Sequence, residues 1–147
     1  MDNLSLEKYF SNNFSQISVV SSDKQMQHIL ASVINPRHHS IKFLFNGSQC
    51  LSNQHSNSNS NSILIIDLLI NDIDGFALVK QLKKENNNLF IIAIMGKPLL
   101  ECMEKNIKNI KRKAIESGAD SVFVAPFNLA ELVSTIECLS ERDLLSA

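Results

Sequence analysis

The chain has few cysteines, no zinc-type cysteine motif and almost no net charge. Its three cysteines, Cys50, Cys102 and Cys138, are widely spaced and form no C-x-x-C pair, which favours reduced structural thiols over a zinc or redox site. No cysteine or carboxylate lies at ligand spacing from the four histidines, so we expect no metal centre. A net charge of -1 does not indicate nucleic acid as an obligate partner.

Membrane and secretion signals are also missing. No apolar run approaches the roughly 18 residues of a transmembrane helix, and the N-terminus MDNLSLEKYF lacks the basic start and apolar stretch of a signal peptide. We therefore expect a cytoplasmic protein without a membrane partner. A hydrophobic content of 44% over 147 residues is enough for one domain with an ordinary core.

Short apolar runs alternate with helical patterns along the chain. The run at 63–66 is uninterrupted, as is typical of a parallel strand that is covered on both faces. The alternation predicts an α/β fold: a doubly wound, five-stranded parallel sheet with helices on both faces. We expect the strands at Gln16–Val20, Ile41–Phe45, Ile63–Ile66, Leu89–Met95 and Ser121–Val124.

The first predicted helix has a capping box at its start. Ser22 is the expected N-cap, with Gln25 at the third helical position. The residues that follow at the spacing of one buried helical face are Met26, Ile29, Leu30 and Val33.

A short second helix could start at Gln49–Leu51, and three longer helices are expected after it. One starts near Phe76, after the turn signal Asp74-Gly75. A long amphipathic helix, the fourth of the fold, covers 99–117 and stops at Gly118. The fifth opens with a second capping box at Asn128.

The predicted domain covers residues 16–142, between an N-terminal extension at 1–15 and a tail at 143–147. Residues 52–62 read SNQHSNSNSNS, which is low-complexity and too polar to bury. We interpret this stretch as a flexible loop inside the domain rather than a boundary.

In a doubly wound sheet, function sits at the carboxyl ends of the strands. A carboxylate, Asp67, stands at the end of the third predicted strand. The other candidate site residues at this edge are Ser21, Ser22, Asp23, Met95 and Ala125.

Two segments resemble the receiver domains of response regulators. In ILIIDLLINDIDGFALVKQLK, Asp67 is followed seven residues later by Asp74-Gly75 and then an apolar residue, as in that family's third strand and following helix. SGADSVFVAPFNLAELVSTI resembles the family's last strand, loop and helix. The resemblance covers roughly 16–140 and implies that Asp67 holds the phospho-acceptor position.

The resemblance also implies partners for that aspartate that this chain lacks. The family's acidic pair, which holds Mg²⁺, is replaced by Ser21 and Ser22, and Asp23 stands where the family has no ligand. The hydroxyl that ends the fourth strand is replaced by Met95, and the lysine before the last loop's proline by Ala125.

We therefore interpret the chain as a degenerate member of the family, a pseudo-receiver. Losing one preorganised donor commonly costs ~10²–10³ in rate, so we expect inefficient phosphorylation of Asp67, no cofactor and no strong Mg²⁺ site. The expected role is non-enzymatic, phosphorylation-independent signalling or transcriptional regulation through protein contacts. Two alternatives stay open: a phospho-acceptor served by a histidine kinase, and a small-molecule sensor that uses the vacated pocket.

The predicted fourth helix carries a row of cations: Lys105, Lys108, Lys111 and Arg112. The row is either a solvated face or a docking surface. Receiver family members bind partners or dimerise through their fourth and fifth helices, so the resemblance implies another signalling protein or a homodimer partner there. No aromatic residues interleave the cations, which disfavours direct nucleic-acid binding.

Overall fold

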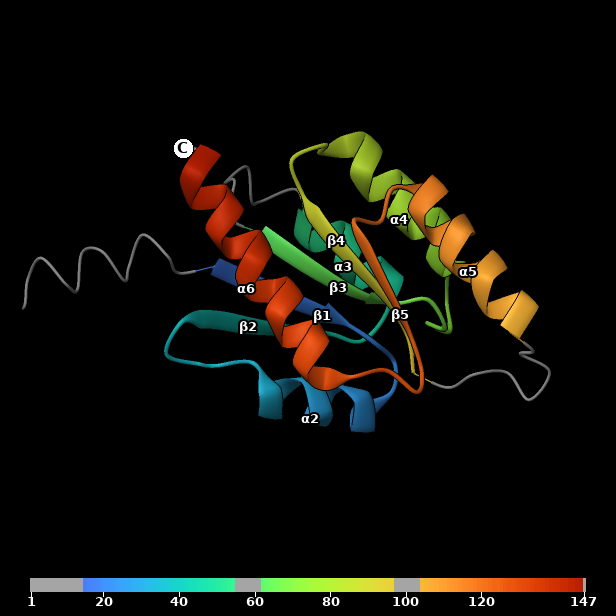
Figure 1. The fold of residues 1–147 in the computed structure, drawn as a ribbon. Helices are drawn as coiled ribbons and strands as arrows, with labels where there is room; N and C mark the ends of the chain where they lie inside the picture. Colours follow the sequence, from blue (N-terminus) through green and yellow to red (C-terminus); the bar gives the residue numbers. More distant parts are fainter. Residues whose placement is uncertain (1–14, 55–61, 97–103, 147) are drawn as a thin grey trace, which may run out of the picture.

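The computed structural model describes residues 15–54, 62–96 and 104–146. Within them, five parallel strands form one sheet in the order β2-β1-β3-β4-β5, which confirms the predicted doubly wound arrangement (Figure 1). The strands are β1 (Ser15–Val20), β2 (His39–Leu44), β3 (Ser62–Asp67), β4 (Phe90–Met95) and β5 (Ser121–Val124).

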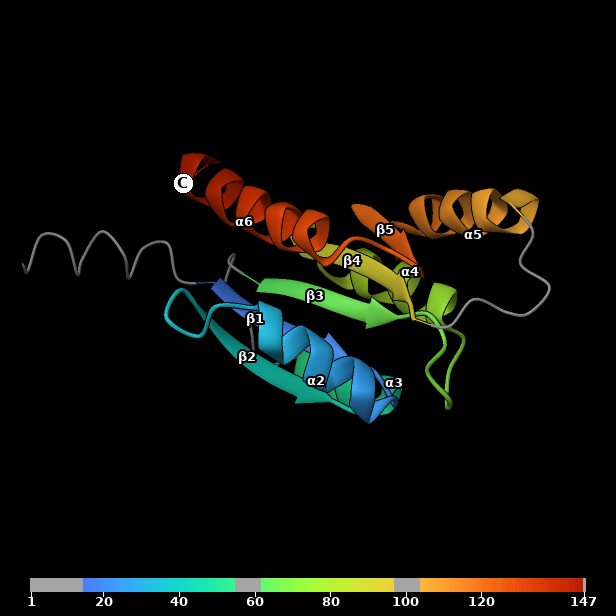
Figure 2. The same ribbon diagram turned by 60° about the horizontal axis from the view of Figure 1, so that its bottom comes forward.

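Helices cover both faces of this sheet. One face is covered by α2 (Lys24–Val33) and α6 (Leu129–Ser146). The opposite face is covered by α3 (Gly47–Gln54), α4 (Gly75–Glu85) and α5 (Glu104–Ser117). Figure 2 shows α2 in front of the sheet, with α3 and α4 behind it.

The central strand β3 explains why its sequence is apolar without alternation. Leu64 and Ile66 pack into the core under α3, α4 and α5. Ile63 and Ile65 pack into the core under α2 and α6. Because both faces of β3 are covered, every side chain of this run has to be apolar.

The start of α2 differs from the prediction. Its N-cap is Asp23, whose carboxylate accepts a hydrogen bond from the Gln25 backbone N–H, and not Ser22. Ser22 does not serve as the N-cap of α2 because its hydroxyl contacts the neighbouring loops instead. Ile29 was expected on the buried face but is 42% exposed, because Met26 and Leu30 already fill the contact with the sheet.

The predicted boundaries also shift. Residues 52–54 extend α3, and Ser62 begins β3, so the expected loop at 52–62 is wrong at both of its ends. The rest of that loop, 55–61, lies outside the described residues, as do the N-terminal residues 1–14. The helix expected from residue 99 is described from Glu104 onwards. The expected tail from 143 is wrong for residues 143–146, because α6 continues to Ser146.

None of the helices in the described part of the chain is long and apolar enough to cross a bilayer.

Gly118 ends α5, as the sequence predicted. Its φ of +123° lies in a region that L side chains rarely adopt, and its N–H donates to the Ile115 carbonyl. A Cβ at this position would also come within 2.7 Å of Lys83 Cγ on α4. The turn therefore requires glycine both for its backbone angle and for its space.

Gly118→Ala should lower the free energy of unfolding by about 1–3 kcal/mol, because alanine is strained at this φ. Urea unfolding followed by circular dichroism measures the change. Asn109→Ala, on an exposed position of the same helix, is the control and should stay within about 0.5 kcal/mol of the native chain. Equal effects of the two substitutions would contradict the backbone argument.

Candidate functional site

Asp67 is the last residue of β3 and is only 5% exposed. Its Oδ2 accepts a hydrogen bond from the Ser21 hydroxyl at 2.8 Å, and its Oδ1 accepts one from the Leu69 backbone N–H at 2.9 Å. The Leu69 contact closes the turn after the strand. Both oxygens of this buried carboxylate are therefore engaged by the protein itself.

Ser21 lies immediately after β1, and its side chain is fully buried. Its Oγ donates to Asp67 and accepts the Asp23 backbone N–H at 3.1 Å. Its own backbone N–H donates to the Leu44 carbonyl. In the sequence, Ser21 stands where the family has an acidic residue. In the structure, it is the hydrogen-bond partner that links Asp67 to the start of α2.

The Ser22 side chain connects the loops that follow β1, β2 and β3. Its Oγ lies 2.8 Å from the Phe45 carbonyl and 3.1 Å from Asn71 Oδ1. The Asn71 backbone N–H points back to the same Oγ at 3.4 Å. A hydroxyl has one proton, so Ser22 donates to one of the two oxygens at a time while it accepts from Asn71.

Asp72 has a role that sequence reasoning missed. Its carboxylate accepts hydrogen bonds from the backbone N–H groups of Gly47 (2.8 Å) and Ser48 (3.1 Å) and from the Ser48 hydroxyl (3.0 Å). The Gly47 hydrogen bond, helped by those of Ser48, lowers the pKa of Asp72 below its ordinary value. An anion at a helix N-terminus is favourable, so Asp72 fastens the loop after β3 to the start of α3.

The Asp74-Gly75 pair begins α4, as expected from the sequence. The Asp74 side chain accepts the Phe76 N–H as the N-cap. A Cβ on Gly75 would approach the Leu68 carbonyl oxygen to 2.5 Å and the Leu68 Cα to 2.6 Å. Only glycine lets α4 start this close to the residue that follows Asp67.

A pocket of about 360 Å³ opens beside Asp67. Three of the predicted site residues, Ser22, Asp23 and Asp67, line it. Lys24, Leu69 and Gly96 also line it and were not predicted as site residues.

The remaining predicted site residues do not line this pocket. Ser21 lies beneath Asp67, fully buried. Met95 is 3% exposed and belongs to the core under α4 and α5. Ala125 is partly exposed and donates its N–H to the Met95 carbonyl. The Ala125-Pro126 peptide bond is cis.

The cationic residues of the fourth predicted helix fall on α5. Lys108, Lys111 and Arg112 are exposed, whereas the side chain of Lys105 lies outside the described residues. The opposite side of the helix turns Ile107, Ile110 and Ala114 towards the core. Lys113, also exposed, places its ammonium 4.5 Å from the centroid of the Phe76 ring on α4.

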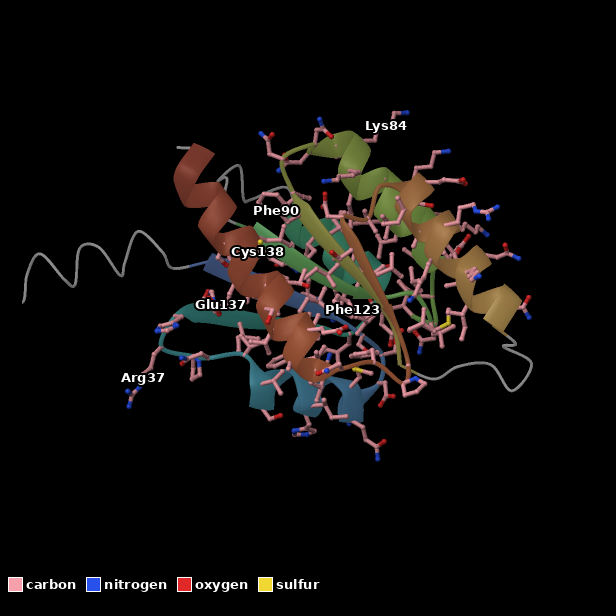
Figure 3. All side chains as sticks on the ribbon, in the orientation of Figure 1. Arg37, Lys84, Phe90, Phe123, Glu137 and Cys138 are labelled. Atoms are coloured by element: carbon pink, nitrogen blue, oxygen red, sulfur yellow. The ribbon has the colours of Figure 1, made fainter. Side chains whose placement is uncertain are left out.

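The histidines do not assemble a metal site in the part of the chain that the structure describes. There, no group of three or more His, Cys, Asp or Glu residues could hold an ion. His39 is buried at the start of β2, where Nε2 lies 2.8 Å from Glu137 Oε1 on α6. Glu137 is labelled in Figure 3. Cys50 is buried as well, and burial raises the pKa of its thiol to about 12, which makes it unreactive.

Residues 17–137 match the family described as the response regulator receiver domain. The chain belongs to this family.

Two curated relatives of this receiver domain are transcriptional regulatory proteins. The chain is 29% identical to the transcriptional regulatory protein CusR of Escherichia coli K12 over 80 residues, which are 54% of this chain and 32% of CusR. It is 22% identical to the transcriptional regulatory protein TcrA of Mycobacterium tuberculosis H37Rv over 127 residues, 86% of this chain and 46% of TcrA. The receiver domain thus spans less than half the length of either relative.

A solved structure has the same fold. The CheY-like receiver domain protein of Methanospirillum hungatei JF-1 superposes with a TM-score of 0.73 and 15% identity, over 91% of this chain and 99% of that chain. This likeness shows the fold. The family match makes the chain a response regulator receiver domain, and Asp67 stands at the end of its central strand.

Asp72→Asn should destabilise the receiver domain at neutral pH. The folded pKa of Asp72 lies below its unfolded value, so its contribution to stability is complete above the ordinary aspartate value of about 3.9 and is lost as the pH falls through the folded pKa. Urea unfolding at several pH values measures the free energy of unfolding of both chains. The value for the native chain should exceed that of the variant at neutral pH, and this difference should shrink as the pH falls.

Ser48→Ala is the matched control for this contact. It removes the hydroxyl but leaves the two backbone donors of Gly47 and Ser48 in place. Its free energy of unfolding should therefore vary with pH in the same way as that of the native chain. If the difference in free energy of unfolding between the native chain and Asp72→Asn grew in acid, the stabilising role of the ionised Asp72 carboxylate would be refuted.

Proposed function

We propose that this receiver domain signals without efficient phosphorylation of Asp67, through contacts with another signalling or regulatory protein. One observation carries the proposal. The buried Asp67 carboxylate is hydrogen-bonded by the neutral Ser21 hydroxyl, at the position where the family resemblance implies an acidic residue beside a divalent cation. The domain would then act as a pseudo-receiver in two-component signalling or transcriptional regulation.

The electrostatics of phosphoryl transfer support this function. The reaction depends on positioning and on charge stabilisation by metal ions and fixed cations or donors. A Mg²⁺ ion prefers several oxygen ligands, mainly carboxylates and waters, but Ser21 offers a hydroxyl that already donates to Asp67. The Asp23 carboxylate caps α2. This donor set does not fit a resident Mg²⁺ ion.

The positions that would respond to a phosphoryl group are also altered. Met95 has a thioether, which accepts only weakly and cannot donate, and it is buried in the core. Ala125 offers no charge. A phosphoryl group on Asp67 would therefore meet neither the hydroxyl nor the lysine that family members use.

The surface formed by α5, β5 and α6 supports the protein-contact part of the proposal. Lys108, Lys111 and Arg112 are exposed along α5. An open hollow of about 440 Å³ lies between β5 and α6, lined by Phe123, Ala130, Glu131, Ser134 and Thr135. Figure 3 shows Phe123 beside α6. The partner would be a different signalling protein or a second copy of the domain.

The pocket beside Asp67 favours one alternative, a sensor of a small molecule. Lys24, Asp23 and Asp67 place charges of both signs around a space of about 360 Å³. A ligand held there would stabilise the fold in proportion to its concentration. Ligand-dependent shifts of the melting temperature that vanish in Ser22→Phe would support the sensor over the docking module.

The native chain should not acquire a phosphoryl group in the presence of a small phosphodonor and Mg²⁺. Intact mass spectrometry, with a phosphorylatable receiver domain as the positive control, gives the occupancy. A stoichiometric mass increase of one phosphoryl group that disappears in Asp67→Ala would overturn the proposal in favour of a working phospho-acceptor.

Restoring the charged residues of the family should restore phosphorylation of Asp67. Ser21→Asp/Ser22→Asp/Ala125→Lys should gain Mg²⁺-dependent phosphorylation by about 10²-fold or more, since it returns both the acidic pair and the cation. The same triple variant with Asp67→Asn is the control. A folded triple variant that stays unmodified would show that the missing charges are not the cause.

A further inference from the structure

A small pocket lies between α2 and β2, apart from the pocket beside Asp67. It has a volume of about 260 Å³, and its apolar walls are Phe43 and Phe45 of β2 and Ala31 of α2. Because β2 is the edge strand of the sheet, no described strand covers these rings from the side (Figure 2). Phe45 is 45% exposed. A hollow with aromatic walls is a candidate binding site.

A buried carboxamide also lines the pocket. Gln27 is 7% exposed, and its Nε2 donates to the carbonyl oxygens of Ser21 at 2.9 Å and Leu44 at 3.3 Å. These two hydrogen bonds use both hydrogens of the amide. No donor among the described residues reaches the Gln27 Oε1 atom, so this oxygen is left for an occupant of the pocket. Since buried acceptors are normally hydrogen-bonded, the occupant should carry a donor.

Two basic side chains complete the lining. Lys24 and His28 are exposed on α2, and with Gln27 and Ala31 they repeat every three or four residues, so all four share one side of the helix. Lys24 begins α2 and also lines the pocket beside Asp67, which places it at the carboxyl edge of the sheet. The pocket therefore combines apolar walls, one buried acceptor and a cation at one end.

These features fit a phenol. A flat ring can lie against Phe43 and Phe45 while a hydroxyl at its tip donates to Gln27. The volume of about 260 Å³ is below the roughly 300–1,000 Å³ of pockets for drug-sized ligands, so a side chain fits better than a large cofactor. The chain has one tyrosine, Tyr9, and no tryptophan.

Tyr9 lies close enough in the sequence to reach the pocket. It precedes Ser15, the first residue of β1, by six positions, and six extended residues span up to about 20 Å. Ser15 pairs with His39 in the sheet, and Phe43 follows His39 by four positions, which is about 13 Å along the strand. The segment before β1 is therefore long enough to turn back towards Phe43.

The charge near Tyr9 agrees with such a path. A segment that turns back before β1 would run antiparallel to β2, so its earlier residues would lie nearer the carboxyl edge of the sheet. Glu7 precedes Tyr9 by two positions and would share its side of an extended chain, about 7 Å nearer that edge. Lys24 stands at the same end of the pocket, so opposite charges would meet there.

We propose that the segment at residues 1–14 folds back along β2 and places the Tyr9 side chain in this pocket. The hydroxyl donates to Gln27 Oε1, and Glu7 lies beside Lys24. While Tyr9 is docked, the aromatic side of β2 is closed to other molecules, so the segment acts as an intramolecular cover. The contact lies apart from the carboxylate of Asp67 and does not depend on its phosphorylation.

The fluorescence of Tyr9 tests the contact, because the chain has no other tyrosine and no tryptophan. Acrylamide should quench Tyr9 at least about twofold less in the folded chain than in the urea-unfolded chain, since a docked ring is shielded. Ala31→Leu fills the pocket and should raise the quenching constant towards the unfolded value. Gln25→Leu adds the same side chain at an exposed position of α2 outside the pocket and should keep the native value. Equal quenching of the folded and unfolded native chain would overturn the inference.

A double-mutant cycle tests the hydroxyl. Tyr9→Phe keeps the ring and removes the donor, so it should lower the melting temperature of the native chain by about 1–5 °C. The same change in the Ala31→Leu chain should have no effect, because leucine already fills the pocket. An equal decrease in both chains would show that the hydroxyl does not act in this pocket.

Two further measurements use the native chain alone. Nuclear Overhauser spectra should place the ring protons of Tyr9 near the Ala31 methyl group, and the absence of this contact would refute the docking. Dilution should leave the acrylamide quenching of Tyr9 unchanged, because the contact is intramolecular. Quenching that increases on dilution would assign the pocket to Tyr9 of a second copy and overturn the intramolecular cover.

Discussion

The central strand β3 lies between β1 and β4 and beneath helices on both faces of the sheet. Its backbone groups are hydrogen-bonded within the sheet, and its side chains from Ile63 to Ile66 have to be apolar. Asp67 is the first residue at which the chain can bear a carboxylate, and even there it is almost buried. A buried carboxylate needs hydrogen-bond donors, and the Ser21 hydroxyl and the Leu69 backbone supply them.

That requirement organises the loops around the site. Ser21 connects Asp67 to the start of α2, and Ser22 connects the end of β1 to the residues after β2 and β3. Asp72 then fastens the loop after Asp67 to the N-terminus of α3. Neutral hydroxyls and backbone N–H groups hold the carboxyl edge of the sheet together. In the proposed function, the partner protein contacts the surface of the helices and not this carboxyl edge.

The surface charge is arranged independently of this edge. The cations of α4 and α5 lie on the solvent side of the helices, opposite the residues that pack on the sheet. Helical periodicity allows this separation, because one side of a helix can meet the core while the other changes its charge freely. Under the proposed function, changes at the carboxyl edge and changes on the outer sides of the helices can therefore occur independently, without a change of fold.

Much of this receiver domain could be predicted from the sequence, because period and turn chemistry are local. The apolar run that ends at Asp67, the Asp74-Gly75 helix start and the stop at Gly118 all appear where they were expected. Losses at Ser21, Ser22, Met95 and Ala125 were visible from the family resemblance. The N-cap at Asp23 and the exposure of Ile29 were not, since each depends on which neighbours already occupy the available space.

The sequence by itself determined the order of strands and helices and the residues that stand at the carboxyl edge of the sheet, because these follow from local apolar periodicity and strand length. Only the tertiary structure decided which of those residues touch. The Ser21–Asp67 hydrogen bond joins residues 46 positions apart, and the contact of Asp72 with the start of α3 spans 25. Such contacts form because parallel strands bring distant loops to one edge, and no local pattern encodes that proximity.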